Sequence, residues 1–374
     1  MTWRTLTCIA MRTKTIDDTT IEYPDEICFC FNPVVINIRG HAWARVQVMV
    51  IDADTSTLHQ EIRNTFGGTC FFDISFYMQG AFDTGLPGEI DYSTAGAEDS
   101  RLGRKFTVQL VMYESDDDFE SFAFDTFAIW GAMQVGERYN GDRTLTWFKN
   151  LPFTVGMYTA GAASVSVTAD SVSKPAIALS ARKVYNIKMK GLDASRELVL
   201  TLPPGTAGSS VFDHTFDYTF QALSNTGSTV RLLVNNCTEG VYLRWVSRHG
   251  YYCYWLFTRG DESKQVANDG EFIRNNMQDY NYVNGYHGGS GRKQRKTEEN
   301  TLPVCAPLVD SDTYDFLFQL ALSPLVDMYA GKDVNGDDRW LAVNVAVDTY
   351  SKTRAVLQDF TAEIILPETR VQSL

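Results

Sequence analysis

Short runs of β-branched and aromatic residues recur about every ten residues along the chain and are separated by Gly, Pro and Asn. In the first half they occupy residues 34–40, 42–54, 104–115 and 121–131, and in the second half residues 181–192, 196–205, 213–223 and 227–236. Evenly spaced short strands with turn residues between them are typical of sandwiches and barrels. The sequence therefore predicts a mainly β protein with two β-sandwich or barrel-like domains, a few short helices and one long loop.

The length of the chain predicts two domains, because 374 residues exceed what one hydrophobic core usually holds. The run of small residues at 160–174 is the candidate boundary, although it could equally be one more exposed strand. We therefore expect an N-terminal β domain at 1–170 and a C-terminal β domain at 171–374. The second would contain a long loop at 258–305 and a helical segment at 311–330.

Local patterns predict several individual elements. Residues 57–68 suit a strand better than a helix, and residues 72–82 predict a short helix capped by Asp73 or Ser75. The segment 311–333 predicts a helix capped by Ser311 or Asp312, followed by a second helix that begins at Ser323-Pro324. Two long strands joined near residues 350–352 are expected to end the chain, and Asn140-Gly141 predicts a hairpin turn.

The net charge of −13 disfavours binding to nucleic acid and to anionic lipid, since both carry negative charge. No stretch approaches the roughly 20 apolar residues that span a bilayer, and residues 1–15 lack the apolar segment of a signal peptide. Seven cysteines without a secretion signal indicate reduced thiols. Cys28 and Cys30 would share one face of a strand, but a lone pair is weak evidence for a metal site.

No motif predicts catalysis, a metal or a cofactor. Asp333, Asn335 and Asp337 match the first ligand spacings of a calcium loop, but the later positions do not fit, and a hairpin turn at Asn335-Gly336 explains them better. The glycine-rich residues 288–293 match neither a nucleophile elbow nor a P-loop. The five histidines show none of the local spacings of a zinc site. We therefore expect a protein that is not an enzyme.

Residues 241–260 predict a β-hairpin that is apolar on both faces. One face, with Trp245 and Trp255, should line a core. The other face is rich in Tyr and Arg, which is typical of a protein interface. The residues expected in this interface are Tyr242, Arg244, Tyr252 and Tyr254. A platform on which sugar rings stack is the rival interpretation.

A basic cluster in the long loop stands out in this acidic chain. It consists of Arg292, Lys293, Arg295 and Lys296. The cluster could be a solvated loop, or a charged arm that binds the acidic surface of a neighbouring copy. We expect all four residues to belong to an interface.

Four segments resemble structural proteins of tailed phages, namely residues 71–83, 241–257, 291–309 and 356–374. The similar family is the distal tail or baseplate hub type found in phages and prophages of Bacteroidetes. The resemblance implies a virion protein that forms a homo-oligomeric ring, a hexamer, between the tail tube and the adsorption apparatus. Its expected partners are itself and other phage tail proteins, with no nucleic acid and no membrane, and its assembly would take place in the host cytoplasm. The alternative function is that of a carbohydrate-binding adhesin or receptor-binding module.

Overall fold

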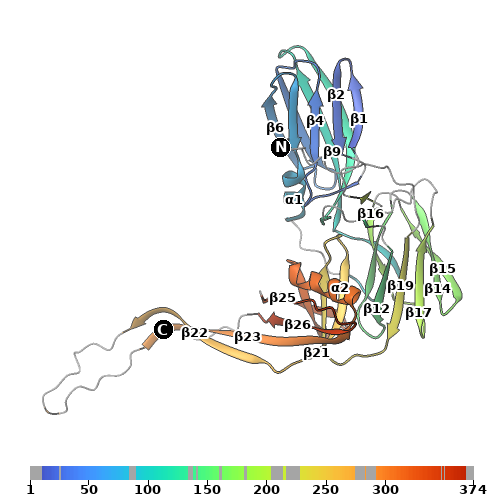
Figure 1. Cartoon of the computed structure of the whole chain (residues 1–374), viewed down its shortest axis with the longest axis vertical. Helices are drawn as coiled ribbons and strands as arrows, with labels where there is room; N and C mark the ends of the chain where they lie inside the picture. Colours follow the sequence, from blue (N-terminus) through green and yellow to red (C-terminus); the bar gives the residue numbers. More distant parts are fainter. Residues whose placement is uncertain are drawn as a thin grey trace. The chain divides into compact units, whose positions relative to one another are not determined.

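The protein is mainly β, as the sequence predicts, and its described residues include two helices (Figure 1). The computed structural model describes residues 11–24, 27–83, 90–133, 138–139, 142–159, 162–180, 183–203, 214–215, 228–273, 283, 292–346, 348 and 350–367. The chain divides into two compact units. Unit 1 comprises Met1–Thr238 and Val246–Cys253, and unit 2 comprises Glu239–Trp245 and Tyr254–Leu374.

Unit 1 begins with two sheets that enclose one core. The first has the strand order β1-β2-β4-β7, with bounds Met11–Ile16, Thr19–Pro24, Val35–Arg39 and Thr69–Asp73. The second has the order β3-β10-β9-β5-β6, with bounds Ile27–Phe29, Phe119–Ile129, Gly103–Tyr113, Arg45–Asp52 and Leu58–Asn64. The segment 57–68 therefore contains a strand, which confirms the prediction.

The alternation of apolar residues explains this pair of sheets. In β5 the side chains of Val46, Val48 and Val50 are buried, and the intervening side chains are partly exposed. Helix α1 (Ser75–Asp83) follows β7, and the Asp73 carboxylate accepts a hydrogen bond from the Ser75 N–H at 3.0 Å. The predicted short helix and its capping by Asp73 are thus confirmed.

Unit 1 continues with further sheets. One has the order β12-β19-β17-β14-β15, with bounds Arg143–Phe148, Ser228–Asn235, Glu197–Leu202, Ala163–Ala169 and Val172–Leu179. Another has the order β13-β16-β8, with bounds Thr154–Thr159, Lys183–Lys188 and Gly96–Asp99. The short strands β11 (Arg138–Tyr139) and β18 (His214–Thr215) pair with each other. Asn140-Gly141, the expected hairpin turn, lies outside the described residues.

The division into units differs from the expected boundary at residue 170. Asp170 and Ser171 form the turn between β14 and β15, and both have positive φ values of 48° and 70°. The Asp170 carboxylate accepts hydrogen bonds from the N–H groups of Ser195, Arg196 and Glu197, at 2.6, 2.8 and 3.0 Å. The run of small residues is therefore a strand within a sheet of unit 1, which was the alternative interpretation.

Unit 2 is a barrel-like sheet with one helix. Its strand order is β21-β20-β24-β25-β26-β23-β22, and β21 also pairs with β23, so that six strands form a closed circuit. The bounds in that order are Tyr252–Arg259, Val241–Val246, Val326–Lys332, Asp338–Val345, Gln358–Ile365, Arg292–Val309 and Ser263–Ile273. Helix α2 (Ser311–Leu322) contributes buried Tyr314, Leu317 and Leu320. The two C-terminal strands, β25 and β26, are those expected from the sequence.

Two expectations about unit 2 are corrected. The segment after Ser323-Pro324 forms strand β24 and not a second helix, because it pairs with both β20 and β25. Helix α2 is capped by Asp310, whose side chain accepts a hydrogen bond from the Thr313 N–H, and not by Ser311 or Asp312. The segment after Ser323-Pro324 is a strand because it pairs with residues distant in sequence, and such pairing does not show in local helix propensity.

The third correction concerns the long loop expected at 258–305. Residues 263–273 and 292–309 of this segment form β22 and β23, which pair with each other over most of their length. Apart from Val283, the residues between these two strands lie outside the described part of the chain. What the composition predicted as an unstructured loop is therefore largely a long hairpin.

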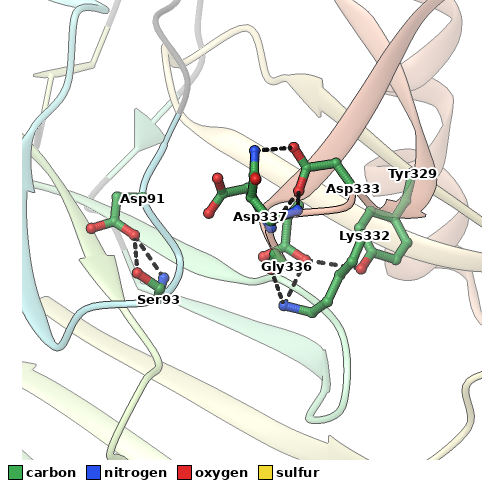
Figure 2. Close-up of polar contacts among 9 residues, drawn as sticks. Asp91, Ser93, Tyr329, Lys332, Asp333, Gly336 and Asp337 are labelled. Atoms are coloured by element: carbon green, nitrogen blue, oxygen red, sulfur yellow. Dashed lines mark hydrogen bonds and ion pairs between the residues drawn. The ribbon is translucent and has the colours of Figure 1, made fainter.

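The segment 333–338 is a tight turn between β24 and β25, as predicted. The Asp333 carboxylate accepts hydrogen bonds from the main-chain N–H groups of Asn335 and Asp337, at 2.8 and 2.9 Å. Figure 2 shows Asp333 and Asp337 in this turn. Gly336 has a φ of +88°, a conformation that favours glycine. The described residues include no cluster of His, Cys, Asp or Glu that could hold a metal ion.

Candidate functional site

The hairpin β20–β21 is buried along most of its length. The exposed fractions of the four residues expected in an interface are 3% for Tyr242, 6% for Arg244, 5% for Tyr252 and 2% for Tyr254. Because these side chains are buried within the chain, none of the four is available for contact with a second copy. Their polar atoms made an interface plausible from the sequence, whereas the structure covers them with other parts of the same chain.

Inside unit 2, an aromatic cluster accounts for the burial of Tyr242 and Tyr254. The two rings are stacked with their centroids 6.1 Å apart, and the Trp340 ring lies 5.8 Å from Tyr242 and 6.3 Å from Tyr254. Tyr329 completes the cluster at 5.3 Å from Trp340, and its hydroxyl donates a hydrogen bond to Asp338. Burial and this hydrogen bond raise the pKa of the Tyr329 hydroxyl.

Arg244 is held at the side of the aromatic cluster. Its Nε donates to the Asp327 carboxylate at 2.8 Å, and its guanidinium carbon lies 4.4 Å from the centre of the Trp340 ring. A planar guanidinium stacks on aromatic faces while it pairs with a carboxylate, and lysine cannot reproduce that geometry. The charge that suggested an interface is thus neutralised within unit 2.

The opposite face of the hairpin packs against α2. Trp245 is fully buried, and its ring centroid lies 5.3 Å from that of Phe316. Trp255 is only half-buried and lies 6.3 Å from the same ring. The prediction that Trp245 lies inside is confirmed, but Trp255 is less buried than Tyr254. The assignment of the two faces of β21 as core and surface therefore fails.

The tip of the hairpin, residues 246–253, belongs to unit 1, although the hairpin's outer parts belong to unit 2. Within unit 1 the Ala132 N–H donates to the Arg248 carbonyl at 2.6 Å, and the Arg143 guanidinium lies 4.7 Å from the Tyr251 ring centre. Burial raises the pKa of the Cys253 thiol to about 12. Within unit 2 the aromatic cluster covers one face of the hairpin and α2 covers the other, and its tip is buried in unit 1, which explains why both faces are apolar.

A second candidate is the ribbon, which we define as residues 264–273 of β22 paired with residues 292–300 of β23. Strand β26 pairs with β23 only from Thr301 to Val309, so β22 is the ribbon's partner strand beyond that point. Figure 1 shows the two strands leaving the rest of unit 2 side by side. The Asn300 carbonyl still accepts a hydrogen bond from the Leu366 N–H at 2.9 Å, and beyond it the described part of the ribbon is two strands wide.

The basic cluster lies on this ribbon. Arg295 and Lys296 are exposed and stand opposite Asp269 and Asn268 in the strand pairing. Arg292 and Lys293 lie farther out on β23, opposite Ile273 and Phe272, and their side chains are outside the described part of the structure. The structure thus brings the four cations to one segment of a strand and not to an irregular loop.

Several thiols and titratable groups of the described residues are buried or paired within the chain. Cys28 and Cys30 share one face and lie in the same core cluster, as the alternation predicted. Burial raises the pKa of the Cys30 thiol to about 12, so the thiolate that a metal needs is disfavoured. Asp52 and Arg104 form a buried ion pair at 2.7 Å, in which Asp52 also accepts from Thr55. These groups are satisfied by their own chain.

A feature that the sequence analysis missed is the exposed edge of unit 1 beside β6. Leu58 and Ile62 of β6 are about half exposed, and a groove of about 520 Å³ is lined by Phe66, Phe71 and neighbouring residues. The signal in the sequence is weak, because only Leu58 and Ile62 of β6 are apolar and three polar residues separate them. Their spacing of four residues also fits one face of a helix, so the pattern does not indicate an exposed edge strand.

Comparisons with known proteins do not assign a family. No family model and no curated protein matches the sequence. Among solved structures, the periplasmic chaperone SfaE is 10% identical, with 56% of this chain and 95% of the chaperone covered, at a TM-score of 0.17. A 1.5-MDa bacterial ice-binding adhesin is 10% identical over 96% of this chain and 98% of its own, also at 0.17. Scores this low carry no argument about function, and neither protein is a phage tail component.

Neither α1 nor α2 is long and apolar enough to cross a bilayer.

Proposed function

We propose that this chain is a structural protein that assembles with copies of itself, and that it is a virion component of the distal tail or baseplate type. In that role it forms a ring between the tail tube and the adsorption apparatus and contacts other tail proteins. The observation that supports assembly is the ribbon of β22 and β23. The phage assignment itself is supported only by the sequence resemblance.

The stability of a two-stranded ribbon is the physical argument. An isolated pair of strands is marginally stable in water, and a third strand or a packing surface is needed for more. The ribbon has an exposed Val266 and the exposed cations Arg295 and Lys296. Packing of this ribbon on a second copy supplies the missing contacts.

Charge favours a second copy as the partner. The chain carries a net charge of −13, whereas the ribbon carries four cations within five residues. In unit 1, the turn between β9 and β10 and the start of β10 expose five acidic side chains, namely Glu114, Asp116, Asp117, Asp118 and Glu120. Opposite charges on two surfaces of one chain favour contacts between different surfaces of successive copies, and such contacts form a ring when the rotation between copies closes.

The test removes the two cations of the basic cluster whose side chains are described, in the variant Arg295→Ser/Lys296→Ser. We expect a lower oligomer mass by light scattering, with unchanged thermal unfolding, because the side chains are exposed. Assembly of the wild type should weaken as salt rises, and the variant should depend less on salt. The matched control is Lys190→Ser/Arg354→Ser, which removes two exposed cations outside the ribbon. Equal masses for the wild type and the ribbon variant at all salt concentrations would contradict the proposal.

The adhesin alternative loses its main support in the structure. It required the Tyr242 and Tyr254 rings to offer a free face to sugars, and both rings are at least 97% buried. We therefore propose assembly alone.

A further inference from the structure

Strand β6 is an open edge of unit 1. It pairs with β5 in seven consecutive register positions, from Ile51↔Leu58 to Arg45↔Asn64, and it is the last strand of its sheet. Figure 1 shows it at the outer margin of that sheet. Its other side therefore presents main-chain groups that no strand of this sheet uses.

The hydrogen bonds at the two ends of β6 show which main-chain groups face outward. The Asp52 N–H donates to the Thr57 carbonyl at 3.0 Å, and the Thr65 N–H donates to the Ala44 carbonyl at 3.3 Å. Because bonding alternates along an antiparallel pair, the odd-numbered residues from 57 to 65 bond to β5. The N–H and C=O groups of Leu58, Gln60, Ile62 and Asn64 therefore point to the open side.

This edge lacks the features that protect other edges of the protein. Strand β15 carries Pro175 and faces a register shift in β14, β22 carries Lys264 and a register shift, and β1 carries Lys14. Strand β6 has no proline, no lysine and no register shift; its two charged residues, Glu61 and Arg63, pair with each other, and it exposes Leu58 and Ile62 at 50% and 56%. Natural proteins block exposed edges with such features unless the edge is used for pairing.

We propose that β6 pairs antiparallel with β6 of a second copy, about a two-fold axis that passes between the two Gln60 residues. In this register Leu58 lies opposite the partner subunit's Ile62, and Gln60 lies opposite the partner subunit's Gln60. All of these residues direct their main-chain groups outward, so the ladder of hydrogen bonds is continuous. On the other face, His59 lies opposite the partner subunit's Glu61.

Other registers match less well. An axis at Glu61 places two carboxylates opposite each other and Leu58 opposite an asparagine, and like charges directly opposite are destabilising. An axis at Ile62 pairs Ile62 with Ile62 of the partner subunit and Glu61 with the partner's Arg63, but it leaves Leu58 without a partner residue inside β6. The register about Gln60 pairs both apolar residues of β6 with apolar residues of the partner strand and places imidazole opposite carboxylate.

The proposed contact goes beyond the proposed function, because it lies on unit 1, does not use the ribbon and closes at two copies. An isologous contact of this kind makes a dimer. The tests below are carried out in the Arg295→Ser/Lys296→Ser background. Ribbon-dependent assembly is removed there, so dimerisation through β6 is measured by itself.

The first test is Gln60→Pro. Proline at this position removes an N–H that points away from β5, so the sheet of unit 1 keeps its own hydrogen bonds. We expect the dissociation constant of the dimer to rise at least about tenfold in sedimentation equilibrium, because two intersubunit hydrogen bonds are lost. Gln60→Ala keeps the main-chain donor and is the control that should dimerise like the wild type. The proposal would be overturned if the Arg295→Ser/Lys296→Ser protein with an unchanged β6 stays monomeric, or if it dimerises no better than the same protein with Gln60→Pro.

Disulfide crosslinking fixes the register and remains informative if Gln60→Pro fails to fold. In a Cys237→Ser background, which removes an exposed native thiol, single cysteines replace Gln60, Glu61 or Ile62 in turn. Only the residue on the two-fold axis meets its own copy at a distance that a disulfide can bridge. We expect Gln60→Cys to form the crosslinked dimer on mild oxidation. Crosslinking at Glu61→Cys or Ile62→Cys in its place, or at none of the three, would contradict the proposed pairing.

Discussion

Tyr254 illustrates how the environment of one residue reverses a prediction made from its type. Alternation correctly placed Tyr254 and Trp255 on opposite faces of β21. The hydroxyl of tyrosine suggested the exposed face, but Tyr254 stacks on Tyr242 and is 2% exposed. Trp255 is half-buried. Neighbours contributed by β24 and β25, which are distant in sequence, determine the outcome.

We therefore expect Tyr254→Ala to lower the free energy of unfolding by about 3–5 kcal/mol, as large-to-small changes of buried rings do. Trp255→Ala should lower it by less, because part of its ring remains in solvent. Chemical denaturation followed by fluorescence and circular dichroism measures both. A larger loss for Trp255→Ala than for Tyr254→Ala would contradict the aromatic cluster as a stabilising contact.

Asp170 provides a prediction about pH. Hydrogen bonds from the N–H groups of Ser195, Glu197 and Arg196 lower the pKa of this carboxyl from 3.8 to about 2. A lowered folded-state pKa stabilises the protein above the unfolded value, and this contribution disappears as the pH falls from about 4 towards 2. Asp170→Asn should therefore melt below the wild type at pH 7, and the difference should shrink across that range. A difference in melting temperature that is independent of pH would rule out the carboxylate as its cause.

At the scale of elements, prediction from neighbouring residues fails for the strands β22, β23 and β24 and succeeds for the turn at Asn335-Gly336. Glycines and charges made residues 258–305 look like a loop, but pairing between residues 19 to 38 positions apart makes most of the described part a ribbon. The turn at Asn335-Gly336 was predicted because its geometry depends on neighbouring residues alone. Turns and capped helices are read from the sequence more easily than strands whose partners are far away.

Two glycines in such local elements allow a paired test. Gly336 has a φ of +88°, and an added Cβ would meet nothing within 4 Å, so Gly336→Ala should cost roughly 1–2 kcal/mol from backbone strain alone. Gly80 lies within α1 and also has open space, so Gly80→Ala should stabilise unit 1 by about 0.5–1 kcal/mol. Denaturant unfolding of the two variants measures both changes. The same sign in both would mean that backbone conformation does not decide the effect.

At the scale of the whole molecule, the chain crosses between its two units three times, and the tip of one hairpin belongs to unit 1 while its strands belong mainly to unit 2. A boundary of this kind leaves no polar linker in the sequence. The composition change at 160–174 marked β14 and its turn into β15, both within one sheet of unit 1. Contacts between distant residues, and not composition, define the units of this protein.

The sequence by itself determined the fold class, the strand at 57–68, the short helix after Asp73, the turn at Asn335-Gly336 and the shared face of Cys28 and Cys30. All of these depend on periodicity or on the conformational preferences of adjacent residues. The tertiary structure alone decided that Tyr242, Arg244, Tyr252 and Tyr254 are buried, that β24 replaces a helix, and that β6 is an open edge. Burial and edge position depend on which distant strands pair, and a one-dimensional pattern of apolar residues is compatible with several such pairings.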